Sequence, residues 1–435
     1  MRRVRMISPH FPPDTSAATH RVRLLAPHLA RYGWEPTVVS VDPRDYEGRL
    51  DPDLASLVPR DLRVVRCRAW PARLTRRVGI GDLGLRAFRG LLESSTRLLR
   101  SESFDVMFVT IYPTYPALLG PIMKRRFGVP FVLDYQDPWV GAWGRAVGPG
   151  GRPDLKSRLT RAMAVKLELH VIRAVDAIRA VSRATHEQVQ ARYPELRRAP
   201  CAAIPLGGEP ADFDRLRRQP RPNPHFDATD GQAHVCFIGT LPPLGLEALR
   251  ALFRATKLLS ERRPQLSRRL RLHFFGTSGR AVSGAAGPVL PVAREMGVDA
   301  CVSEVGSRLD YLDALTVQTQ ASAILMTGST EPHYTASRLY PAVLAGRPIL
   351  ALFHEGSSVV EILRAVARPP AARVVTFDDA QRAGSRVEAI YTELVALVGD
   401  PADAPGAIDA GAMREFSAEC LAGKLAAVLD QATGL

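Results

Sequence analysis

The sequence predicts an α/β protein with two Rossmann-like, doubly wound parallel-sheet domains that face each other across a cleft. Short apolar runs alternate with helical patterns along all 435 residues, and such runs are typical of parallel strands covered by helices on both faces. A polar segment with three prolines and no periodicity, residues 216–232, separates two blocks of this alternation and is interpreted as a linker. Open parallel sheets bind ligands at the carboxyl ends of their strands, so each domain is expected to hold one ligand in the cleft.

The expected domain boundaries follow from this pattern: one domain at 1–215, the linker at 216–232, a second domain at 233–405 and a C-terminal helix within 406–435. Pro27 lies inside the helical run Val22–Tyr32 and predicts a kink or a later helix start there. The predicted strands are Val4–Ser8, Thr37–Val41, Val106–Ile111, Phe131–Asp134, Ala177–Ser182, Val235–Gly239, Leu272–Gly276, Cys301–Val305, Ala323–Met326, Ile349–Phe353 and Val374–Phe377.

The composition is that of a globular protein, with 46% hydrophobic and 23% charged residues. The chain has no apolar run of roughly 18 residues, so we expect no membrane-spanning helix, and its start has no secretory signal pattern. The five cysteines form no Cys-x-x-Cys pair. This usage argues against a disulfide framework or a cysteine zinc site and favours a cytoplasmic protein.

The positive charge is concentrated in the first half of the chain. Residues 1–205 contain 34 Lys and Arg against 19 Asp and Glu, a net +15, whereas the remaining residues contribute −1 to the total of +14. Such a field attracts an anionic partner: a nucleic acid, an acidic lipid or a phosphorylated substrate. A solvated basic surface without a partner is the alternative. Nucleic-acid binding is disfavoured because aromatic platforms and a helix-turn-helix are missing from the pattern.

A Gly-x-Gly-x-x-Gly pattern occurs at residues 79–84, but no apolar strand precedes it, so it is interpreted as a loop and not as a dinucleotide-binding turn. Two turns in the second half are better candidates for binding phosphate. Gly239 and Thr240 follow one apolar strand, and Gly276, Thr277 and Ser278 follow the next. Glycine permits close approach of the backbone, and a following helix offers free N–H groups to an anion.

A third candidate lies between the strand Ala323–Met326 and the next helix. Thr335 or Ser337 is expected to cap this helix. Arg338 in the first turn is a poor partner for the helix dipole, and an anion bound at the same terminus would explain it. Glu331 lies in the preceding loop, where its carboxylate could accept sugar or ribose hydroxyls. An ordinary polar loop is the alternative.

In the first half, Asp134 and Asp137 follow a predicted strand, with Trp139 offering a flat apolar surface suited to a sugar ring. The hydroxyl-rich loop 11–21 leaves the first strand and enters a helix, which also suits an anion. Asp134 alone would more often be a structural carboxylate, and the cluster favours a site. No spacing of His, Cys, Asp and Glu matches a metal site, and no nucleophile elbow or Walker lysine occurs.

Taken together, these stretches resemble retaining glycosyltransferases of the two-domain GT-B fold, of the family 4-like bacterial cell-wall and lipopolysaccharide type. The resemblance rests on the order and spacing of Leu29–Val39, Glu168–Ser182, Ile204–Gly208 and Ser337–Leu350, the last of which is the most specific. In that family the C-terminal domain binds a nucleotide-sugar donor and the N-terminal domain binds an acceptor, without an obligatory metal or other cofactor.

The resemblance implies a set of site residues. The implied catalytic residues are Asp137, Glu331 and Arg338. The implied acceptor-binding residues are Thr15, Ser16, Thr19, His20, Arg21, Asp137 and Trp139. The implied donor-binding residues are Gly239, Thr240, Gly276, Thr277, Ser278, Arg308, Ser337, Arg338, Leu339 and Tyr340.

Three positions depart from the family pattern. Thr240 and Leu244 stand where the family commonly has an arginine and a lysine that clamp the diphosphate, and Pro341 stands where it has the glutamate that holds the ribose. Arg280, Arg308 and Arg338 are the charges nearest to the expected strand ends. Each lost charged partner of the phosphates is expected to cost about 1.5–3 kcal/mol.

The predicted function is therefore metal-independent transfer of a hexose, with retention, from a nucleotide-sugar to an anionic, lipid-linked or cell-surface glycan acceptor. The basic first half would then hold a cytoplasmic enzyme at the inner face of the membrane. A catalytically silent relative that binds a ligand or scaffolds an assembly is the first alternative. A nucleotide-sugar epimerase, which needs no acceptor, is the second.

Overall fold

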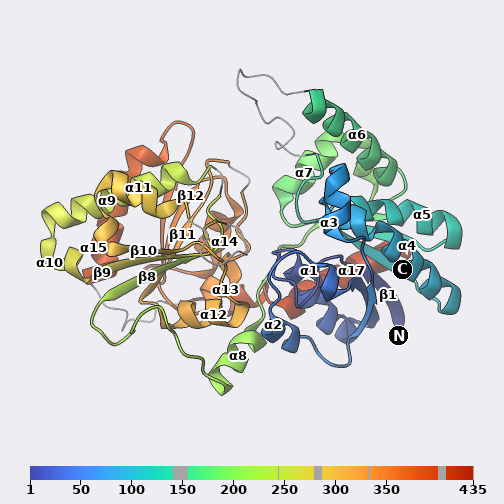
Figure 1. Cartoon of the computed structure of the whole chain (residues 1–435), viewed down its shortest axis with the longest axis horizontal. Coiled ribbons are helices and arrows are strands. Elements are labelled where there is room, and N and C mark those ends of the chain that lie inside the picture. Colours follow the sequence, from blue (N-terminus) through green and yellow to red (C-terminus); the bar gives the residue numbers. More distant parts are fainter. Residues whose placement is uncertain (141–154, 243, 279–286, 332–333, 400–407, 435) are drawn as a thin grey trace. The chain divides into compact units, whose positions relative to one another are not determined.

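The computed structural model describes residues 1–140, 155–242, 244–278, 287–331, 334–399 and 408–434 (Figure 1). The chain divides into two compact units. Unit 1 contains Met1–Leu206 and Ala418–Leu435, and unit 2 contains Gly207–Ser417. Among the described residues, none of the helices combines the length and the apolar character needed to span a bilayer.

Unit 1 is built on a seven-stranded parallel sheet with the strand order β3-β2-β1-β4-β5-β6-β7. The central strand β4 is apolar at every position except Thr110, and all six of its residues are buried, as expected for a strand that is covered on both faces. The strands are β1 Arg2–Ile7, β2 Trp34–Val41, β3 Arg63–Cys67, β4 Val106–Ile111, β5 Phe131–Tyr135, β6 Ala177–Ala180 and β7 Cys201–Ala203.

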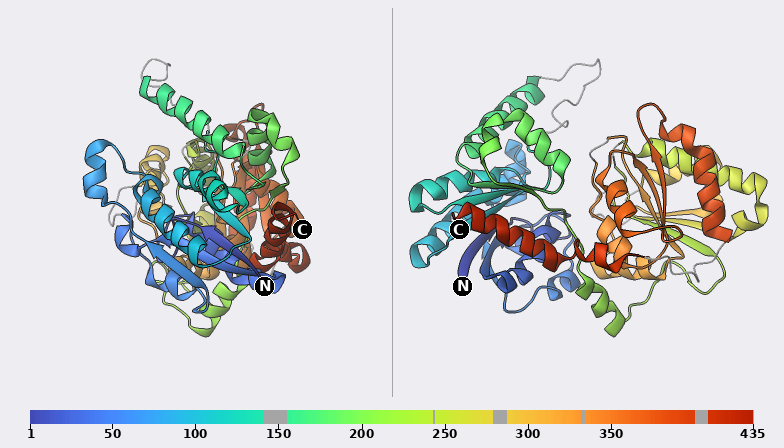
Figure 2. Two further views of the ribbon diagram at one scale, coloured as in Figure 1. Left: turned by 90° about the vertical axis from the view of Figure 1, so that its right-hand side faces the viewer. Right: turned by 180° about the vertical axis from the view of Figure 1, so that it is seen from behind.

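Helices cover both faces of this sheet. One face packs against α1, η1 and the C-terminal helix α17, through residues such as Val22, Leu25 and Leu425, and Figure 2 shows α17 in red beside the N-terminal elements. The other face packs against α4 and α5 through Leu91 and Met123. The helices are α1 Thr19–Leu25, η1 Ala26–Tyr32, η2 Pro43–Asp45, α2 Pro52–Ser56, α3 Ala72–Thr75, η3 Arg76–Val78, α4 Leu83–Ser101, η4 Tyr115–Leu118, α5 Leu119–Phe127, α6 Leu155–Ile172, α7 Arg183–Arg192, η6 Pro194–Arg198 and α17 Ala418–Ala432.

Unit 2 is built on a six-stranded parallel sheet with the order β10-β9-β8-β11-β12-β13. Helices α9, α11 and α15 lie on one face, and α12 and α13 lie on the other (Figure 1). The elements are α8 Pro210–Arg218, β8 Ala233–Ile238, α9 Leu246–Arg262, α10 Pro264–Arg269, β9 Leu270–Phe275, α11 Val289–Met296, η7 Asp299–Cys301, β10 Val302–Val305, α12 Tyr311–Gln320, β11 Ala323–Thr327, α13 Leu339–Leu344, β12 Ile349–His354, α14 Ser358–Val366, β13 Ala372–Phe377, η8 Ala383–Arg386, α15 Val387–Gly399 and α16 Ala410–Arg414.

The predicted fold class is confirmed: every predicted strand is present, in two separate parallel sheets. Two further strands, β3 and β7, were not predicted. Both lie at the edges of the unit 1 sheet, where β3 contains two arginines among its five residues and β7 has only three residues. An edge strand is covered on fewer sides, so it lacks the continuous apolar run that marks a central strand.

The local predictions at Pro27 and at residues 79–84 are also confirmed. Helix α1 ends at Leu25, and the chain continues as the 3-10 helix η1 with Pro27 in its first turn. Gly79 ends η3 with a φ of +79°, and α4 begins at Leu83. Between the end of β3 at Cys67 and the start of α4, the described chain contains helical segments and no strand that leads directly into these glycines. The turn is therefore not a dinucleotide-binding fingerprint, which follows a strand.

The unit boundaries differ from the expected domain boundaries. Unit 1 ends at Leu206, and α17 returns to it at the end of the chain. Part of the expected linker is helical, since α8 runs to Arg218. Farther along, Phe226 stacks on His234 and His273 of the unit 2 sheet, with ring centroids 4.5 and 5.1 Å apart. The end of this segment is therefore packed against unit 2.

Candidate functional site

The carboxyl ends of β8 and β9 in unit 2 bring two predicted glycines together. Gly239 follows β8 with a φ of +126°, and Gly276 follows β9 with a φ of +76°. A methyl group added at Gly276 would lie 3.8 Å from the Cα of Gly239. Both backbones are left-handed, a conformation that favours glycine. The two turns therefore present bare backbone side by side at the edge where open parallel sheets bind ligands.

Arg338 lies against these turns. Its Nη1 donates a hydrogen bond to the carbonyl oxygen of Thr240 (3.1 Å), and its Nη2 donates one to the carbonyl oxygen of Thr327 (2.7 Å). The guanidinium also lies 4.6 Å from the ring centroid of Phe237. A guanidinium has five N–H groups, so three remain after these two bonds. No ion pair of Arg338 occurs within the described residues, and its positive charge is available to an anion.

Three other predicted residues lie at the same edge of unit 2. The Cα of Arg308 is 3.6 Å from a methyl group added at Gly276. Ser337 is exposed beside Arg338. Glu331 is half-buried in the loop after β11, and its backbone N–H bonds to the hydroxyl of Ser329. Arg280 falls outside the described residues.

Thr277 and Ser278 do not fit the predicted role in donor binding. Thr277 is buried and donates its hydroxyl hydrogen bond to Glu304. The Ser278 hydroxyl donates to the carbonyl oxygen of Gly306 (2.6 Å). Glu304 also accepts hydrogen bonds from the N–H groups of Val289 (3.1 Å) and Leu290 (2.9 Å) at the start of α11. The first N–H groups of α11, which the sequence offered to a phosphate, are thus bound by a carboxylate of the protein itself.

The predicted cap of the helix after β11 is wrong. Helix α13 begins at Leu339, its N-cap is Arg338, and no side chain caps it. Thr335 instead pairs with the hydroxyl of Ser358 (3.0 Å). Leu339 and Tyr340, which were predicted to bind the donor, have buried side chains in unit 2. They fix the position of the helix that carries Arg338.

In unit 1 the structure assigns Arg21 a different role from the predicted one. Arg21 is fully buried. Its Nε lies 3.1 Å from a carboxylate oxygen of Asp134, and its other N–H groups bond to the carbonyl oxygens of Ile204 and Pro205. Arg179 binds the same carboxylate. Asp134 is therefore a structural carboxylate between two arginines, and Arg21 is not accessible to an acceptor.

The hydroxyl-rich loop after β1 forms a network around Asp14. The Asp14 carboxylate receives hydrogen bonds from Ser16, Thr19 and His10, with a His10 Nδ1 distance of 2.7 Å. Burial raises the pKa of Asp14, but these hydrogen bonds and the charge of His10 lower it more, so the pKa lies below its ordinary value. Thr15 donates to the carbonyl oxygen of Arg49 (3.1 Å). The hydroxyl groups of this loop are therefore used within the protein, and the buried hydroxyl of Thr19 is not available to an acceptor.

Asp137 and His20 retain partly accessible positions in unit 1. Asp137 is exposed, two residues beyond β5, and His20 is half-buried on α1. Trp139 packs edge-on against Tyr115 at a centroid distance of 6.3 Å and contacts the core of the unit. Of the predicted acceptor residues, Asp137 is the exposed one, but its carboxyl group itself is largely shielded from water, and this burial raises its pKa to about 6.

The sequence pattern did not identify Arg179, His10 or Glu304 as residues with a role at a site. The arginine in the apolar strand β6 was a signal, because a buried arginine requires a counter-charge. The spacing of His10 and Asp14 was another signal, since both residues follow β1 closely. Nothing local connects Glu304 with α11. The described residues contain no group of three or more His, Cys, Asp or Glu side chains that could hold a metal ion.

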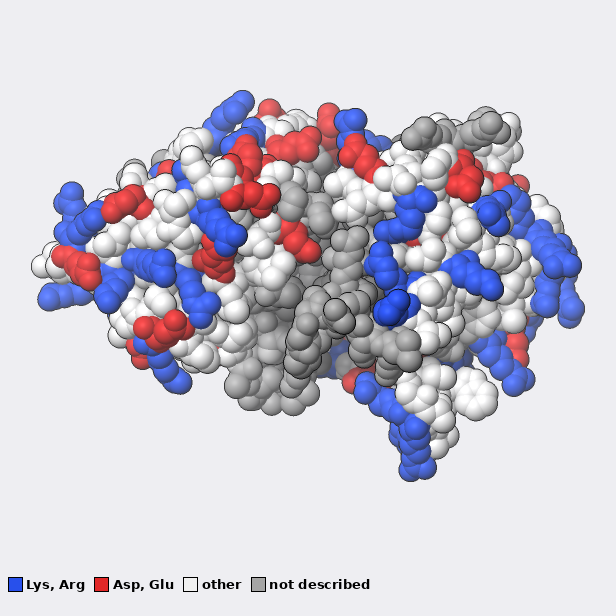
Figure 3. Space-filling model, turned by 90° about the horizontal axis from the view of Figure 1, so that it is seen from above, with Lys and Arg blue, Asp and Glu red and all other residues white. Residues whose placement is uncertain are grey.

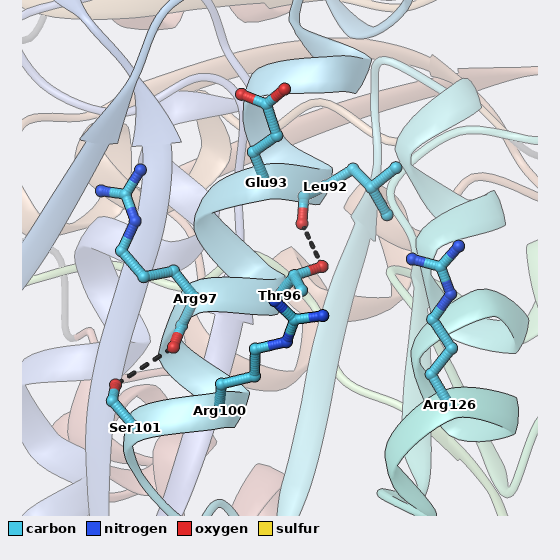
Figure 4. Close-up of a pocket in the computed structure, with 7 residues that line it drawn as sticks. All are labelled: Leu92, Glu93, Thr96, Arg97, Arg100, Ser101 and Arg126. Atoms are coloured by element: carbon cyan, nitrogen blue, oxygen red, sulfur yellow. Dashed lines mark hydrogen bonds between the residues drawn. The ribbon is translucent and has the colours of Figure 1, made fainter.

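A shallow hollow of about 580 Å³ lies between the ends of α4 and α5. Figure 4 shows Arg100 of α4 and Arg126 of α5 on its two sides. It lies at the amino-terminal edge of the sheet, because Glu102 just beyond α4 pairs with Arg3 at the start of β1. This hollow is therefore at the opposite edge from the predicted acceptor residues. It is lined by Leu92, Glu93, Thr96, Arg97, Arg100, Ser101 and Arg126.

Comparison with known proteins agrees with this architecture. Residues 16–207 match the family model described as a glycosyl transferase 4-like domain. A search of curated proteins gave no match. The chain is similar to HepE of Anabaena in complex with UDP-glucose, with a TM-score of 0.59 at 14% identity over 98% of this chain and 99% of that one.

Two further solved structures have the same architecture. A glycosyltransferase of Rickettsia africae ESF-5 gives a TM-score of 0.55 at 11% identity, over 99% of this chain and 98% of that one. The UDP-GlcNAc 2-epimerase of Methanocaldococcus jannaschii gives 0.52 at 11% identity, over 98% and 99%. The match to the glycosyl transferase 4-like model is thus confined to residues 16–207, and the chain as a whole has the two-domain GT-B fold.

Proposed function

We propose that this chain is a hexosyltransferase that moves a sugar from a nucleotide-sugar bound by unit 2 to an acceptor bound by unit 1. The observation that carries the proposal is Arg338, an arginine without an ion pair in the described residues, beside the bare backbone of Gly239 and Gly276. An anion at this position would meet a guanidinium and two close backbone turns. A nucleoside diphosphate has the required charge, and the HepE structures contain UDP or UDP-glucose.

The chemistry requires stabilisation of a leaving group. The bond between the sugar C1 and the diphosphate oxygen breaks, C1 bonds to the acceptor hydroxyl oxygen, and the hydroxyl proton passes to the leaving diphosphate, on which negative charge accumulates. Arg338 and Arg308 would stabilise this charge from fixed positions, which is worth most where water is excluded. We propose transfer without a metal ion, since two guanidinium groups supply the positive charge, and with retention at C1, as the resemblance to retaining glycosyltransferases implies.

The proposed acceptor is an anionic or lipid-linked glycan of the cell surface. Asp137 lies just beyond β5 and is exposed as a residue, and burial raises the pKa of its carboxyl to about 6, so it is the best placed of the predicted residues to bind an acceptor hydroxyl. The charge excess of unit 1 supports an anionic partner. In Figure 3 the charged side chains on the visible face of this unit are mostly lysine and arginine, whereas those of unit 2 are of both signs.

A thermal-shift screen tests the donor half of this proposal. Ligands that bind only the folded protein raise its melting temperature, by an amount that follows their affinity. We expect UDP and UDP-sugars to raise it and the GDP, ADP, CMP and dTDP forms to have smaller effects. Release of the nucleotide in the presence of acceptor glycans then tests transfer. A chain that binds none of these nucleotides would contradict the proposal.

A silent, ligand-binding relative is the second candidate. Leu244, where a phosphate-binding lysine was expected, is 52% exposed and uncharged, and Pro341 in α13 cannot hold a ribose. Such a protein would bind a nucleotide-sugar without turning it over. An epimerase, the third candidate, would change the sugar without any acceptor. Product analysis with and without acceptor separates the three.

A further inference from the structure

Unit 1 exposes a cluster of large apolar side chains on one short segment. Within the described residues, twelve large apolar side chains are exposed, and five of these lie within residues 70–85. Isolated exposed apolar residues are ordinary, but a cluster marks an interaction site. The cluster, named the apolar tip here, consists of Trp70 (54% exposed), Leu74 (48%), Val78 (73%), Ile80 (36%) and Leu85 (38%).

The backbone of the apolar tip is ordered by its own hydrogen bonds. Helix α3 begins after Pro71, and η3 ends at Gly79, whose φ is +79°. The N–H of Ile80 bonds to the carbonyl oxygen of Thr75 (2.9 Å). The base of the tip is fixed to α4, since the N–H of Trp70 bonds to the carbonyl oxygen of Arg86 (3.0 Å). The tip thus presents its apolar side chains from a fixed scaffold.

Two arginines beside the apolar tip make no ion pair with any residue that the structure describes. Arg68, Arg76 and Arg86 are paired with Asp45 or Glu47 at their base. By contrast, Arg73 and Arg77 are exposed and make no ion pair or side-chain hydrogen bond within the described residues. Their charges point to an anionic partner that is absent from the chain itself.

The apolar tip lies at the carboxyl edge of the unit 1 sheet. It directly follows β3, and its far end at Gly84 packs on Pro113 and Pro116 of the loop after β4. That loop adds the exposed ring of Tyr112 (47%). Asp137, the exposed residue proposed to meet the acceptor, follows the neighbouring strand β5. The tip and the proposed acceptor residue are therefore on the same edge of one sheet.

We propose that the apolar tip docks unit 1 on a bilayer that contains anionic lipids. A tryptophan, aliphatic side chains and unpaired arginines on one short projection match the interfacial region, where the apolar groups enter the acyl boundary and the arginines meet lipid phosphates. The alternative is a folded protein partner, which would need carboxylates facing Arg73 and Arg77. In that case the chain would not bind vesicles in the test below. In combination with the proposed function, docking here would bring the acceptor edge to a lipid-linked acceptor.

Vesicle flotation with the full chain tests the proposal. We expect binding to vesicles of phosphatidylcholine with phosphatidylglycerol and much weaker binding to phosphatidylcholine alone. The variant Trp70→Ser with Leu74→Ser and Val78→Ser should bind at least about tenfold more weakly, because its apolar area no longer leaves water. Arg73→Gln with Arg77→Gln should lower binding to anionic vesicles about fivefold for each arginine.

Matched controls separate a docking surface from general charge. Arg97→Gln with Arg100→Gln removes the same charge from the opposite edge of the sheet. Salt screens the attraction between lipid and these distant arginines, so vesicle binding should stay within about twofold of the wild type. Tyr32→Ser removes an exposed apolar side chain elsewhere in unit 1 and should have no effect. Equal losses in the Arg97 and Arg73 pairs, or a tip variant that binds as well as the wild type, would overturn the proposal.

Tryptophan fluorescence provides a second measurement that does not depend on the tip variant. Trp70 is the exposed indole of the tip, so vesicles should shift its emission to the blue and brominated lipids should quench it. In Trp70→Phe the shift should disappear while flotation remains. The docking proposal and the proposed function can be tested independently of each other. Vesicle binding needs no donor, and turnover of a soluble acceptor needs no vesicle.

Discussion

Arg338 donates a hydrogen bond from Nη1 to the carbonyl oxygen of Thr240, a residue 98 positions earlier in the chain. With the bond from Nη2 to Thr327, one guanidinium connects the ends of β8 and β11. The same group holds the strand ends and leaves a positive charge at the edge where the donor is proposed to bind. The following predictions separate these structural and functional roles.

Replacing Arg338 should affect donor binding more than stability. A hydrogen bond to a charged group contributes about 1.5–3 kcal/mol, so Arg338→Ala should weaken nucleotide-sugar binding about 10- to 100-fold and abolish turnover. Titration calorimetry with UDP-sugars measures the first effect and nucleotide release measures the second. Arg347→Ala is the matched control, because Arg347 also donates to a carbonyl oxygen, that of Thr319 (2.7 Å), but lies before β12 at the other edge. An equal loss of affinity in both variants would contradict the role of Arg338.

Gly239→Ala should disturb the same corner from the backbone side. A Cβ at Gly239 would lie 3.1 Å from Nη1 of Arg338, and the φ of +126° is strained for alanine. Such strain costs about 1–3 kcal/mol, and the displaced guanidinium should lower donor affinity as well. Gly297→Ala shares a positive φ (+69°) but would meet no atom within 4 Å. It should lose stability alone, and reduced donor affinity in that control would refute the interpretation.

Asp134→Ala should unfold unit 1 and not merely inactivate it. The change leaves Arg21 and Arg179 buried without a counter-charge, and breaking a buried pair costs about 3–5 kcal/mol. Urea denaturation should show the loss. Glu93→Gln, which breaks an exposed ion pair with Arg89, should leave the urea midpoint unchanged. A stable but inactive Asp134→Ala protein would instead indicate a catalytic carboxylate.

Unit 2 should lose stability on acidification through His273. Its imidazole is buried, with Nε2 2.9 Å from Nδ1 of His234 and Nδ1 2.7 Å from the Ser303 hydroxyl. Burial first, and then the charges of His234, His225 and Arg271, lower its pKa from 6.5 to about 4, against the opposing charge of Asp230.

The direction of this effect follows from the two pKa values. Above pH 6.5 both states are neutral and the full stability is present. As the pH falls from 6.5 towards 4, the unfolded chain binds a proton that the folded chain does not, so the free energy of unfolding falls by about 2–3 kcal/mol. Urea midpoints measured across this range should show the decline, and His273→Gln should flatten it. An equally steep decline in that variant would assign the effect to other groups.

Much of the fold could be predicted from local pattern. The uninterrupted apolar run of β4 predicted a central strand, and Pro27 predicted the end of α1, because both signals act over a few residues. The edge strand β3, with its arginines, was not predictable in this way. Gly239 and Gly276 were identified at the ends of their strands, since a left-handed turn after a strand requires glycine.

The roles of the charged residues were less predictable. Arg21 and Glu304 carry the same side chains whether they face solvent or the interior, and a sequence does not state which residue lies opposite. Arg21 meets Asp134 across 113 positions, and Glu304 meets the start of α11 from a neighbouring strand. Because of these two pairings, Arg21 is not available to an acceptor and the start of α11 is not available to a phosphate, although both contacts had been predicted.

By itself, then, the sequence determined the two-sheet α/β class, the positions of the central strands, the turns after β8 and β9 and the accumulation of arginine in the first half. Periodicity, turn chemistry and charge are properties of short segments, and they survive in any folded arrangement. Only the tertiary structure decided that Arg338 faces the bare turns, that Asp134 is buried between two arginines and that residues 70–85 project apolar side chains. Burial and pairing depend on which distant segments pack together, and that information is not local.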